Sequence, residues 1–490
     1  MPSPSQILTR RRIFASPLLF SGLHALHEKG KAATVAGYGE LQPAGEMLTL
    51  PRGFQYSILS YEGDMMADGF PVPSAMDGMG CFGLPNGNVL LVRNHEIGEA
   101  GRVFRPRPAN STSTTAGILE HRREDHYGPR RFAYDEYSGG GTTSVEVDLR
   151  TRRKVREYWS LVGTLRNCAG GATPWGSWMT CEETLASASA AEYAANHGYV
   201  FEVPIDTSPG MPVSPVPLRR LGRFAHEAVA VDPATGTIYQ TEDQGDVSGF
   251  YRYVPAAKPT KPGDLASDHG KLQMLRINSA PQYVTCIDQK TGVALPASWV
   301  DIPDPDPTPA SATVNGQNAS VVFRQGLNNG GAIFRRGEGC WYWQGKIYFT
   351  ATNGGDIGLG QIWVYDLAAS TLTLVFETPD LHVLDFPDNI TVSPRGGLLV
   401  CEDGGGGQFL RGITPSGDIF DFARNIYNTA EMAGACYSPD GQTLFVNVYG
   451  RATVRTASRY GTTPVIPIGS EVREKAFTLA IWGPWGQGLL

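Results

Sequence analysis

Short apolar segments of this 490-residue chain repeatedly end in carboxylate or amide side chains. The sequences RNHE (93–96), TCEE (180–183) and CEDG (401–404) each close such a segment, and TCEE places the thiol of Cys181 beside two carboxylates. Carboxylate oxygens suit hard cations such as calcium, whereas a thiolate prefers softer transition metals. These residue types, recurring at the same place in a pattern, favour metal binding.

Polar groups also stand directly before apolar segments. The sequences GRFAHE (222–227), FRRGEG (334–339) and FPDN (386–389) each lead into one. Any single case is explained by turn chemistry, because Asp, Asn and Gly are ordinary turn residues. The recurrence of a polar group on both sides of several segments is what favours a shared role.

The segments themselves form a recurring unit, in which a turn with Gly is followed by alternating apolar residues and then by a polar residue. Alternation with period two predicts a short β-strand. The copies span 84–96, 173–183, 231–245, 340–355, 392–404 and 437–450. The last three recur about every 40–50 residues, which is typical of one propeller blade. We therefore predict an all-β fold, a β-propeller with about five to seven blades and loop insertions. A pair of β-sandwiches is the alternative.

Propeller geometry brings the repeated polar ends together, because blades surround a central channel. A carboxylate at the same end of each blade would build an inward-facing ring of oxygen ligands. Carboxylates crowded in this way repel one another, and their pKa values rise unless cations compensate. The pattern therefore predicts a metal site at the channel.

Composition narrows the class of protein. The chain has 59 Gly and 35 Pro, 18% charged residues and a net charge of -7. The abundance of Gly and Pro disfavours long helices, and the negative charge argues against a nucleic-acid partner. Seven cysteines without a CxxC pair exclude a zinc ribbon. The Walker, GxSxG and HExxH motifs are absent from the sequence.

The N-terminal segment resembles an export signal. Three arginines precede an apolar stretch within 9–26, and Arg11-Arg12 resembles the twin-arginine type. A basic amphipathic helix that stays on the protein is the alternative. We predict an export leader over 1–37, recognised by the export machinery, and a periplasmic or secreted protein. A single propeller domain over 38–490 would carry insertions near 106–142, 255–264 and 301–318.

Six motifs in the same order resemble the PhoX family of exported bacterial alkaline phosphatases. They are NHE, WGxWxTCEE, GRFAHEAVAVD, FRRGEG, DNITVSPRGGLLVCEDG and CYSPDGQTLFVN, and they cover roughly 80–450. The resemblance implies a β-propeller that hydrolyses phosphate esters with ferric iron (Fe3+) and calcium (Ca2+) at the mouth of the channel.

The resemblance also implies roles for particular residues. Cys181 would be an iron ligand, Glu96 and Glu227 would be iron or bridging ligands, and Arg336 would face the phosphate. Calcium would be shared by Glu182, Glu338, Asp388, Glu402 and Asp403. Arg336, Cys181 and Glu96 would thus carry the chemistry.

Two other functions are compatible with the sequence. One is a calcium-dependent propeller hydrolase such as a lactonase, which would use a single calcium and no cysteine ligand. The other is a non-catalytic exported propeller that binds calcium for stability and a partner on its open face. For the phosphatase, the partner is a small-molecule phosphate ester, and we expect a monomer.

Overall fold

The computed structural model describes residues 37–98, 128–189, 193–450 and 475–490. All but the last residue of the predicted export leader, and much of the predicted insertion at 106–142, lie outside these ranges. Among the described residues, no helix has the length and apolar character needed to cross a membrane.

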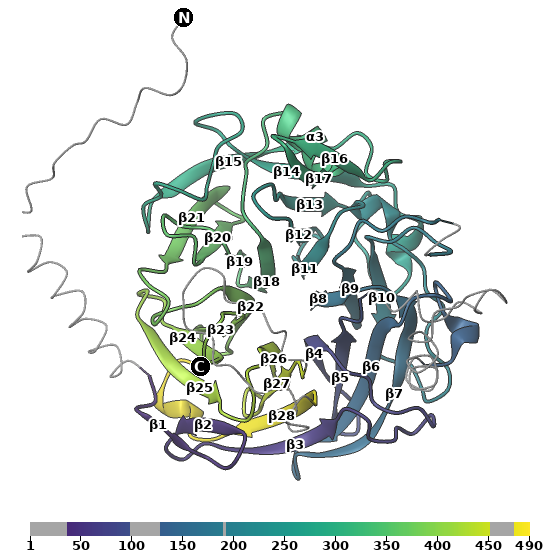
Figure 1. Cartoon of the computed structure of the whole chain (residues 1–490), viewed down its shortest axis with the longest axis vertical. Coiled ribbons are helices and arrows are strands. Elements are labelled where there is room, and N and C mark those ends of the chain that lie inside the picture. The colour runs from purple at the N-terminus through teal and green to yellow at the C-terminus, as the bar shows by residue number, and fades with distance from the viewer. Residues whose placement is uncertain (1–36, 99–127, 190–192, 451–474) are drawn as a thin grey trace, which may run out of the picture.

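The described strands surround a central axis in six consecutive antiparallel sets (Figure 1). In chain order the sets are β4 (Met76–Gly83), β5 (Val89–His95), β6 (Gly140–Asp148) and β7 (Arg153–Thr164); β8 (Asn167–Ala172), β9 (Ser177–Glu182) and β10 (Val200–Pro204); β11 (His226–Val231), β12 (Ile238–Glu242), β13 (Phe250–Val254) and β14 (Lys271–Ile277); β18 (Gly337–Trp343), β19 (Lys346–Ala351), β20 (Gln361–Asp366) and β21 (Thr371–Glu377); β22 (Pro387–Val392), β23 (Leu398–Glu402), β24 (Phe409–Ile413) and β25 (Ile419–Asn425); and β26 (Met432–Tyr437), β27 (Leu444–Val448), β28 (Phe477–Trp482) and β3 (Gln55–Tyr61).

Strands outside these sets join some of them. β15 (Ala294–Asp301) pairs with both β14 and β21, so that two sets share one nine-stranded sheet. β1 (Leu41–Pro43) and β2 (Leu48–Pro51) extend the set of β25. The predicted all-β propeller is confirmed. Hydrogen bonding gives four described sheets of four or more strands, fewer than the expected number of about five to seven, because β15 fuses two sets and β8–β10 form only three strands.

The first strand of each set lies nearest the axis, and β4, β8, β11, β18, β22 and β26 follow one another around it. The ring is closed by the two ends of the described chain, because β3 pairs with β28 and Tyr61 lies opposite Phe477. Apolar side chains fill the space between neighbouring sets, as where Val89 and Val145 pack with Phe445. Burial of this kind stabilises the ring and fixes where its inner strands begin.

Two segments that the sequence marks as insertions contain short elements. A 3-10 helix, Asp264–Ser267, follows the Pro-rich stretch at 255–264. The segment 301–318 leads into a hairpin of β16 (Ser311–Val314) and β17 (Gln317–Ser320), followed by the single α-helix of the described residues, α3 (Val321–Asn328). The hairpin lies over the outer part of the β11–β14 set (Figure 1).

Candidate metal centre

The innermost strands share one irregularity in their pairing. Five of them pair with the neighbouring strand at their first residue and β26 at its first two residues, and the register then shifts, as a β-bulge does, before regular pairing resumes. A bulge re-aims the side chain beside it and is common next to functional sites. Six equivalent bulges therefore direct six equivalent residues toward the axis.

We call the residues directly after the first paired residue the ring positions. They are Asp77, Cys168, Glu227, Glu338, Asp388 and Ala433. Five of the six can ligate a metal ion. Asp77, Cys168, Glu227 and Glu338 are buried, which sets them deep in the molecule.

Two further sets of equivalent residues lie beside the ring. The exit positions follow the end of each second strand and are Glu96, Glu183, Asp243, Thr352, Asp403 and Tyr449. The turn positions precede each innermost strand and are Ala75, Arg166, Ala225, Arg336, Phe386 and Glu431. Four turn positions have left-handed backbone, among them Arg166 with φ 51° and Arg336 with φ 45°. Such backbone is costly for residues other than Gly and is retained where the surrounding structure enforces it.

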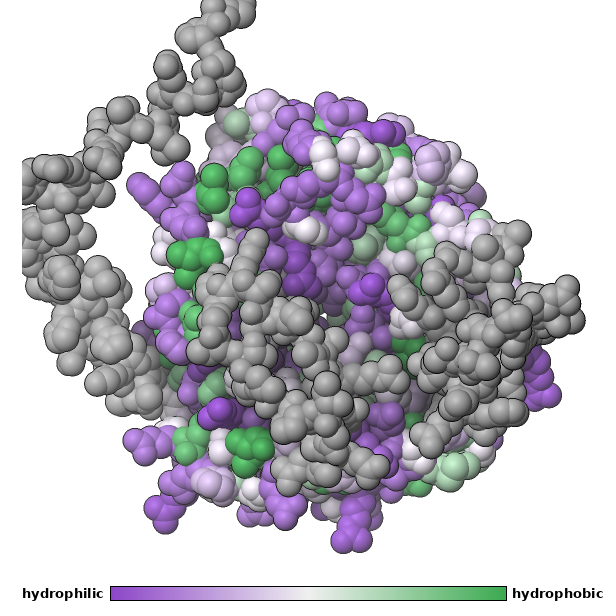
Figure 2. Space-filling view, in the orientation of Figure 1, coloured by the Kyte–Doolittle hydropathy of each residue, from purple (hydrophilic) through white to green (hydrophobic). Residues whose placement is uncertain are grey.

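These three sets enclose one cavity of about 200 Å³, which we call the ring cavity. Every residue that lines it occupies a ring, exit or turn position. It contains nine carboxyl groups, two guanidinium groups, one thiol and one phenol. Hydrophilic residues gather near the middle of the face shown in Figure 2. The carboxyl groups outnumber the guanidinium groups by far, so the cavity attracts cations.

Potential ligand atoms in the cavity form four linked groups of three. Within each group they lie within 4.8 Å of one another. The groups share members, so that Cys168, Glu227 and Asp388 each belong to two of them. The groups are Asp77, Glu96 and Cys168; Cys168, Glu183 and Glu227; Glu227, Glu338 and Asp388; and Asp388, Asp403 and Glu431.

Burial and mutual repulsion raise the pKa values of six carboxyl groups of the cavity, those of Asp77, Glu183, Glu227, Glu338, Asp388 and Glu431. The pKa of Glu227 is well above its usual value because the group is desolvated and faces Asp388 and Asp77. For the same reasons, desolvation and the neighbouring Asp403, the pKa of Asp388 rises to about 7. The pKa of the Cys168 thiol is also raised, by burial and by Glu227. A bound cation would reverse these shifts, because it favours the charged forms.

Two arginines lie at the edge of the cavity. Arg166 Nη2 donates to Glu183 Oε2 at 2.6 Å and to Glu96 Oε1 at 3.3 Å. Arg336 donates from Nε and Nη2 to Asp243, and from Nη2 to Glu338 Oε1 at 2.5 Å. In neither guanidinium group does Nη1 make a hydrogen bond to a described residue. Each arginine therefore has an N–H group available for an anion.

The donor set fits metal ions. Asp77 Oδ1 is buried without a hydrogen-bond partner among the described residues. Burying an unpaired carboxylate oxygen is costly unless it binds a proton or a cation. The mixture of carboxylates with a single thiol supplies both hard and soft ligands. The residues present thus match a centre with more than one kind of metal.

The cavity is closed beneath the ring by small residues. Gly78, Gly339 and Gly434 follow or adjoin the ring positions, and only about 20 Å³ of space remains below them. A Cβ on Gly78 would come within 2.4 Å of Cα of Ala169, so only glycine fits there. A ligand therefore reaches the ring from one face of the propeller.

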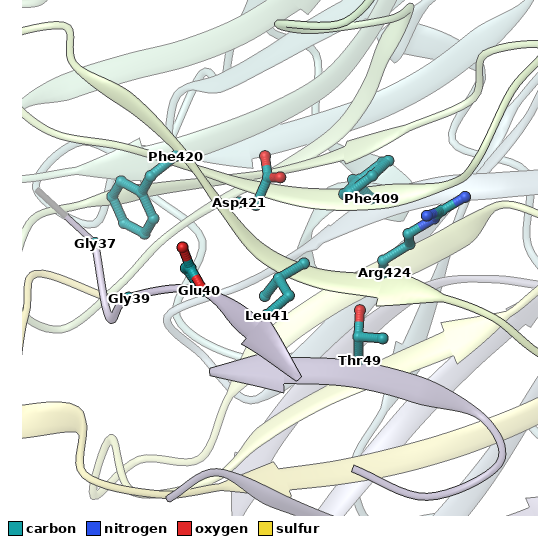
Figure 3. A pocket seen from close by; sticks show the side chains of 9 residues that line it. All are labelled: Gly37, Gly39, Glu40, Leu41, Thr49, Phe409, Phe420, Asp421 and Arg424. Carbon is teal, nitrogen blue, oxygen red and sulfur yellow. The ribbon is translucent and has the colours of Figure 1, made fainter. Parts of the chain in front are cut away.

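A separate cavity of about 350 Å³ lies between the described N-terminal strands and β25 (Figure 3). Phe409, Phe420, Asp421 and Arg424 line one side of it, and Glu40 lines the other. None of the groups of potential metal ligands among the described residues is located there. This cavity is not part of the metal centre.

The structure brings most of the predicted site residues together. Six of them line the ring cavity: Glu96, Glu227, Arg336, Glu338, Asp388 and Asp403. The predicted site residues do not include the remaining lining residues, which are Asp77, Arg166, Cys168, Glu183, Asp243, Glu431 and Tyr449.

Three predicted residues lie elsewhere, and their placement corrects the prediction. Cys181 is fully buried in an apolar cluster with Met179 and Val200. Its thiol has no place at the ring, where Cys168 lies instead. The pKa of Cys181 is raised by burial, as expected for a thiol inside a core.

Glu182 and Glu402 are held within their own blades. Glu182 Oε1 accepts hydrogen bonds from the Leu165 N–H at 2.9 Å and from His197 Nδ1 at 2.7 Å. Glu402 Oε1 accepts one from Arg411 Nε at 2.7 Å. Both are the last paired residues of their strands, one residue before an exit position. Successive strand residues point to opposite faces, which is why the neighbours Glu183 and Asp403 reach the cavity.

The fold resembles that of solved protein structures. The structure is similar to that of Pseudomonas fluorescens PhoX in complex with vanadate, with a TM-score of 0.64 and 18% identity over 92% of this chain and 98% of that one. It is less similar to a gluconolactonase from Xanthomonas campestris, with a TM-score of 0.32 and 13% identity over 70% of this chain and 82% of that one. No curated protein sequence matches the chain.

The first of these similarities, at its level of identity, concerns the fold alone. The family is given by the sequence, which matches the alkaline phosphatase PhoX family over residues 36–451. That range includes all five ring positions that can ligate a metal and both arginines of the cavity. The chain therefore belongs to the alkaline phosphatase PhoX family.

Proposed function

We propose that this protein is a metal-dependent phosphatase that hydrolyses phosphate monoesters in the ring cavity. The observation that carries the proposal is the cavity itself, which combines nine carboxyl groups and a thiol with two arginines. Membership of the alkaline phosphatase PhoX family supports it independently. A phosphate monoester is an anion, so an acidic cavity can accept it only when cations outweigh the carboxylates.

The composition of each ligand group indicates which metal ion it would bind. The two groups that contain Cys168 offer a soft ligand and suit ferric iron, whereas the all-carboxylate groups suit calcium. When bound, these ions would neutralise phosphoryl oxygens and lower the pKa of an attacking water. Glu227 belongs to one group of each kind, which makes it the bridge between the two halves of the centre.

The arginines act on the substrate directly in this proposal. Arg166 and Arg336 keep their carboxylate partners and donate from Nη1 to phosphoryl oxygens, so that the phosphate is oriented for attack. Attack by water forms one P–O bond, and the P–O bond to the leaving group breaks. One proton of the water passes to the alcohol oxygen, and the products are an alcohol and inorganic phosphate.

The alternatives derived from the sequence account for less of the site. A lactonase with a single calcium would leave most of the four linked ligand groups, and Cys168, without a role. A propeller that binds calcium for stability alone does not explain two arginines whose Nη1 atoms remain available beside the cavity. The gluconolactonase similarity has too low a TM-score to support the first alternative.

We also propose that the folded protein is exported to the periplasm or beyond by the twin-arginine route, directed by Arg11 and Arg12. Export after folding would allow the metals to enter under controlled conditions. Replacing both arginines with Lys should retain the protein in the cytoplasm. Normal export of that variant would contradict the proposal.

One sample can test the proposed activity. The full chain, purified with iron and calcium present, should hydrolyse p-nitrophenyl phosphate, and elemental analysis should find both metals. Dihydrocoumarin, a lactone, serves as the control substrate and should remain intact. Lactone hydrolysis with one calcium and no iron would favour the lactonase, and calcium without any hydrolysis would favour the binding protein.

A further inference from the structure

A second cavity adjoins the ring cavity. It encloses about 350 Å³, and we call it the outer pocket. The two cavities share Arg166, Glu183, Asp243 and Arg336 as a common wall. A phosphoryl group held at this wall would point its leaving group into one cavity or the other. The ring cavity is closed below and crowded by carboxylates, so the outer pocket is where an organic group fits.

The chemistry of the outer pocket selects among leaving groups. Beyond the shared wall it is lined by the polar side chains of Thr184, Gln244 and Asn318, with Leu185 as the one large apolar residue. Its lining among the described residues contains no aromatic ring. A nucleobase or phenyl group is usually held by stacking on an aromatic side chain. Amide and hydroxyl side chains instead suit a ligand that carries several hydroxyl groups.

Asn318 is presented to this pocket by an anchored hairpin. It lies in β17, between two side chains that bind the last residue of β12 and the loop that follows it. Ser320 Oγ donates to Glu242 Oε1 at 2.6 Å, and Gln317 Nε2 donates to Asp246 Oδ2 at 3.1 Å. That loop also carries Asp243 and Gln244, which line the pocket. The hairpin is therefore fixed to the wall of the site on both sides of Asn318.

The Asn318 amide itself is available for a ligand. Asn318 is exposed, and its side chain makes no hydrogen bond to a described residue. An amide can donate and accept at once, as the hydroxyl groups of a sugar require. A volume of about 350 Å³ is at the lower end of the range of about 300–1,000 Å³ that is usual for small-molecule sites. It suits one sugar ring better than a larger group.

We propose that the outer pocket is the leaving-group subsite, that it takes the hydroxylated, sugar-like alcohol of a phosphate monoester, and that Asn318 determines this specificity. The inference rests on the proposed phosphatase function and names its substrate class. In the reaction the alcohol oxygen keeps its carbon, loses its bond to phosphorus and gains a proton from water. The released sugar then leaves from the outer pocket.

The test compares one sugar ester with one aromatic ester. The metal-loaded full chain, Asn318→Ala and the control Thr313→Ala are assayed with glucose 6-phosphate and with phenyl phosphate. Thr313 lies opposite Asn318 in the same hairpin, is exposed and does not line the pocket. The non-hydrolysable methylene phosphonate of glucose 6-phosphate and benzylphosphonate are titrated in parallel by calorimetry, so that binding is measured apart from turnover.

Asn318→Ala should lower kcat/KM for glucose 6-phosphate about tenfold, mainly through KM, as expected for the loss of one or two hydrogen bonds. The affinity for the sugar phosphonate should fall by the same factor, while phenyl phosphate, benzylphosphonate and Thr313→Ala should show no change. Equal effects on both esters, or none on either, would overturn the subsite while the phosphatase stands. Hydrolysis of neither ester by the wild type would overturn the phosphatase and the subsite together.

Discussion

The Cys168 thiol donates a hydrogen bond to Glu183 Oε2 at a distance of 3.3 Å. Cys168 occupies a ring position and Glu183 an exit position of the same blade, so the contact joins two of the residue sets that build the cavity. Arg166, at the turn position of that blade, donates to the same carboxylate oxygen at 2.6 Å. One blade thus supplies a soft ligand, a hard ligand and a cation to a single point.

Removal of metal ions should destabilise the fold. Ions that bind only the folded protein stabilise it by about 2.7 kcal/mol when the free ion is at 100 times its dissociation constant. A calcium chelator should therefore lower the melting temperature measured by calorimetry, and added calcium should restore it. Magnesium is the control ion, because its small octahedral shell suits these crowded carboxylates less well. If neither the chelator nor added calcium changes the melting temperature, the carboxylates of the ring cavity do not form a cation site.

Without bound metal, the protein should become less stable as the pH rises, whereas carboxylates that are paired in the folded state usually make a protein more stable as the pH rises. The pKa of Asp388 is raised to about 7 in the folded state, and that of Glu227 is also raised. At a pH between the unfolded and the folded pKa, these side chains are therefore protonated in the folded protein and ionised in the unfolded chain. Their contribution to stability is complete below the unfolded pKa and is lost as the pH rises through the folded pKa. The free energy of unfolding should therefore fall between about pH 4 and 7. Urea titrations with and without calcium check this, and saturating calcium should flatten the slope.

His197 should contribute strongly to stability. It lies between Glu182 Oε1 at 2.7 Å and Asp135 Oδ2 at 3.2 Å and is fully buried. Burial lowers the pKa of His197, but the two carboxylates outweigh that effect and raise it to about 9. The imidazole of His197 is therefore charged at neutral pH. His197→Gln should cost about 3–5 kcal/mol, because it leaves buried carboxylates without a cation. The exposed His269→Gln is the control in the same urea titration. A loss below about 1 kcal/mol would show that the His197 pair is not needed.

Arg336 should be needed for catalysis in a way that its neighbour is not. Its guanidinium group spans Asp243 and Glu338 at the cavity, whereas Arg335 pairs with the exposed Asp246. Lys cannot reproduce a planar fork of donors. Arg336→Lys should lower kcat/KM for p-nitrophenyl phosphate about tenfold or more, and Arg335→Lys should leave it unchanged. Equal kinetics for the two variants would remove Arg336 from the phosphate site.

The sequence predicts the architecture well because its signals are local. Short apolar strands that end in a polar residue, such as LLVCE (398–402), and turns such as SPDGQ (438–442) identify the repeated unit. Polar residues at the strand ends then indicate where the site lies. Glu96 and Glu227 could be identified in this way, since each is the carboxylate nearest to its strand end.

The choice between adjacent residues could not be made from the pattern. Glu182 and Glu183 differ by one position, and a shift of one residue on a strand exchanges the two faces. Which of them reaches the cavity depends on the bulge after Asn167, a feature of the paired backbone rather than of composition. The family resemblance implies Glu182 and Cys181, and the sequence pattern alone does not favour Glu183 and Cys168 over them.

A signal for Cys168 is present in the sequence. Four of the five ring positions that can ligate a metal are followed by Gly or Ala, as in Asp77-Gly78, Cys168-Ala169, Glu227-Ala228 and Glu338-Gly339, and the exception is Asp388, which Asn389 follows. The reason is steric: a Cβ on Gly339 would lie 2.5 Å from the Ile390 nitrogen of the neighbouring inner strand. A ligand type followed by Gly or Ala at the start of an inner strand thus distinguishes Cys168 from Cys181, which is followed by Glu182.

The most direct measurement is the iron content of two cysteine variants. Cys168→Ala and Cys181→Ala remove the same group from neighbouring strands, one at the ring and one in the apolar core. After loading with iron and calcium, Cys168→Ala should have lost its iron and its p-nitrophenyl phosphate hydrolysis, and Cys181→Ala should retain both. Iron retained by Cys168→Ala, or lost only by Cys181→Ala, would contradict a metal centre built at the ring positions.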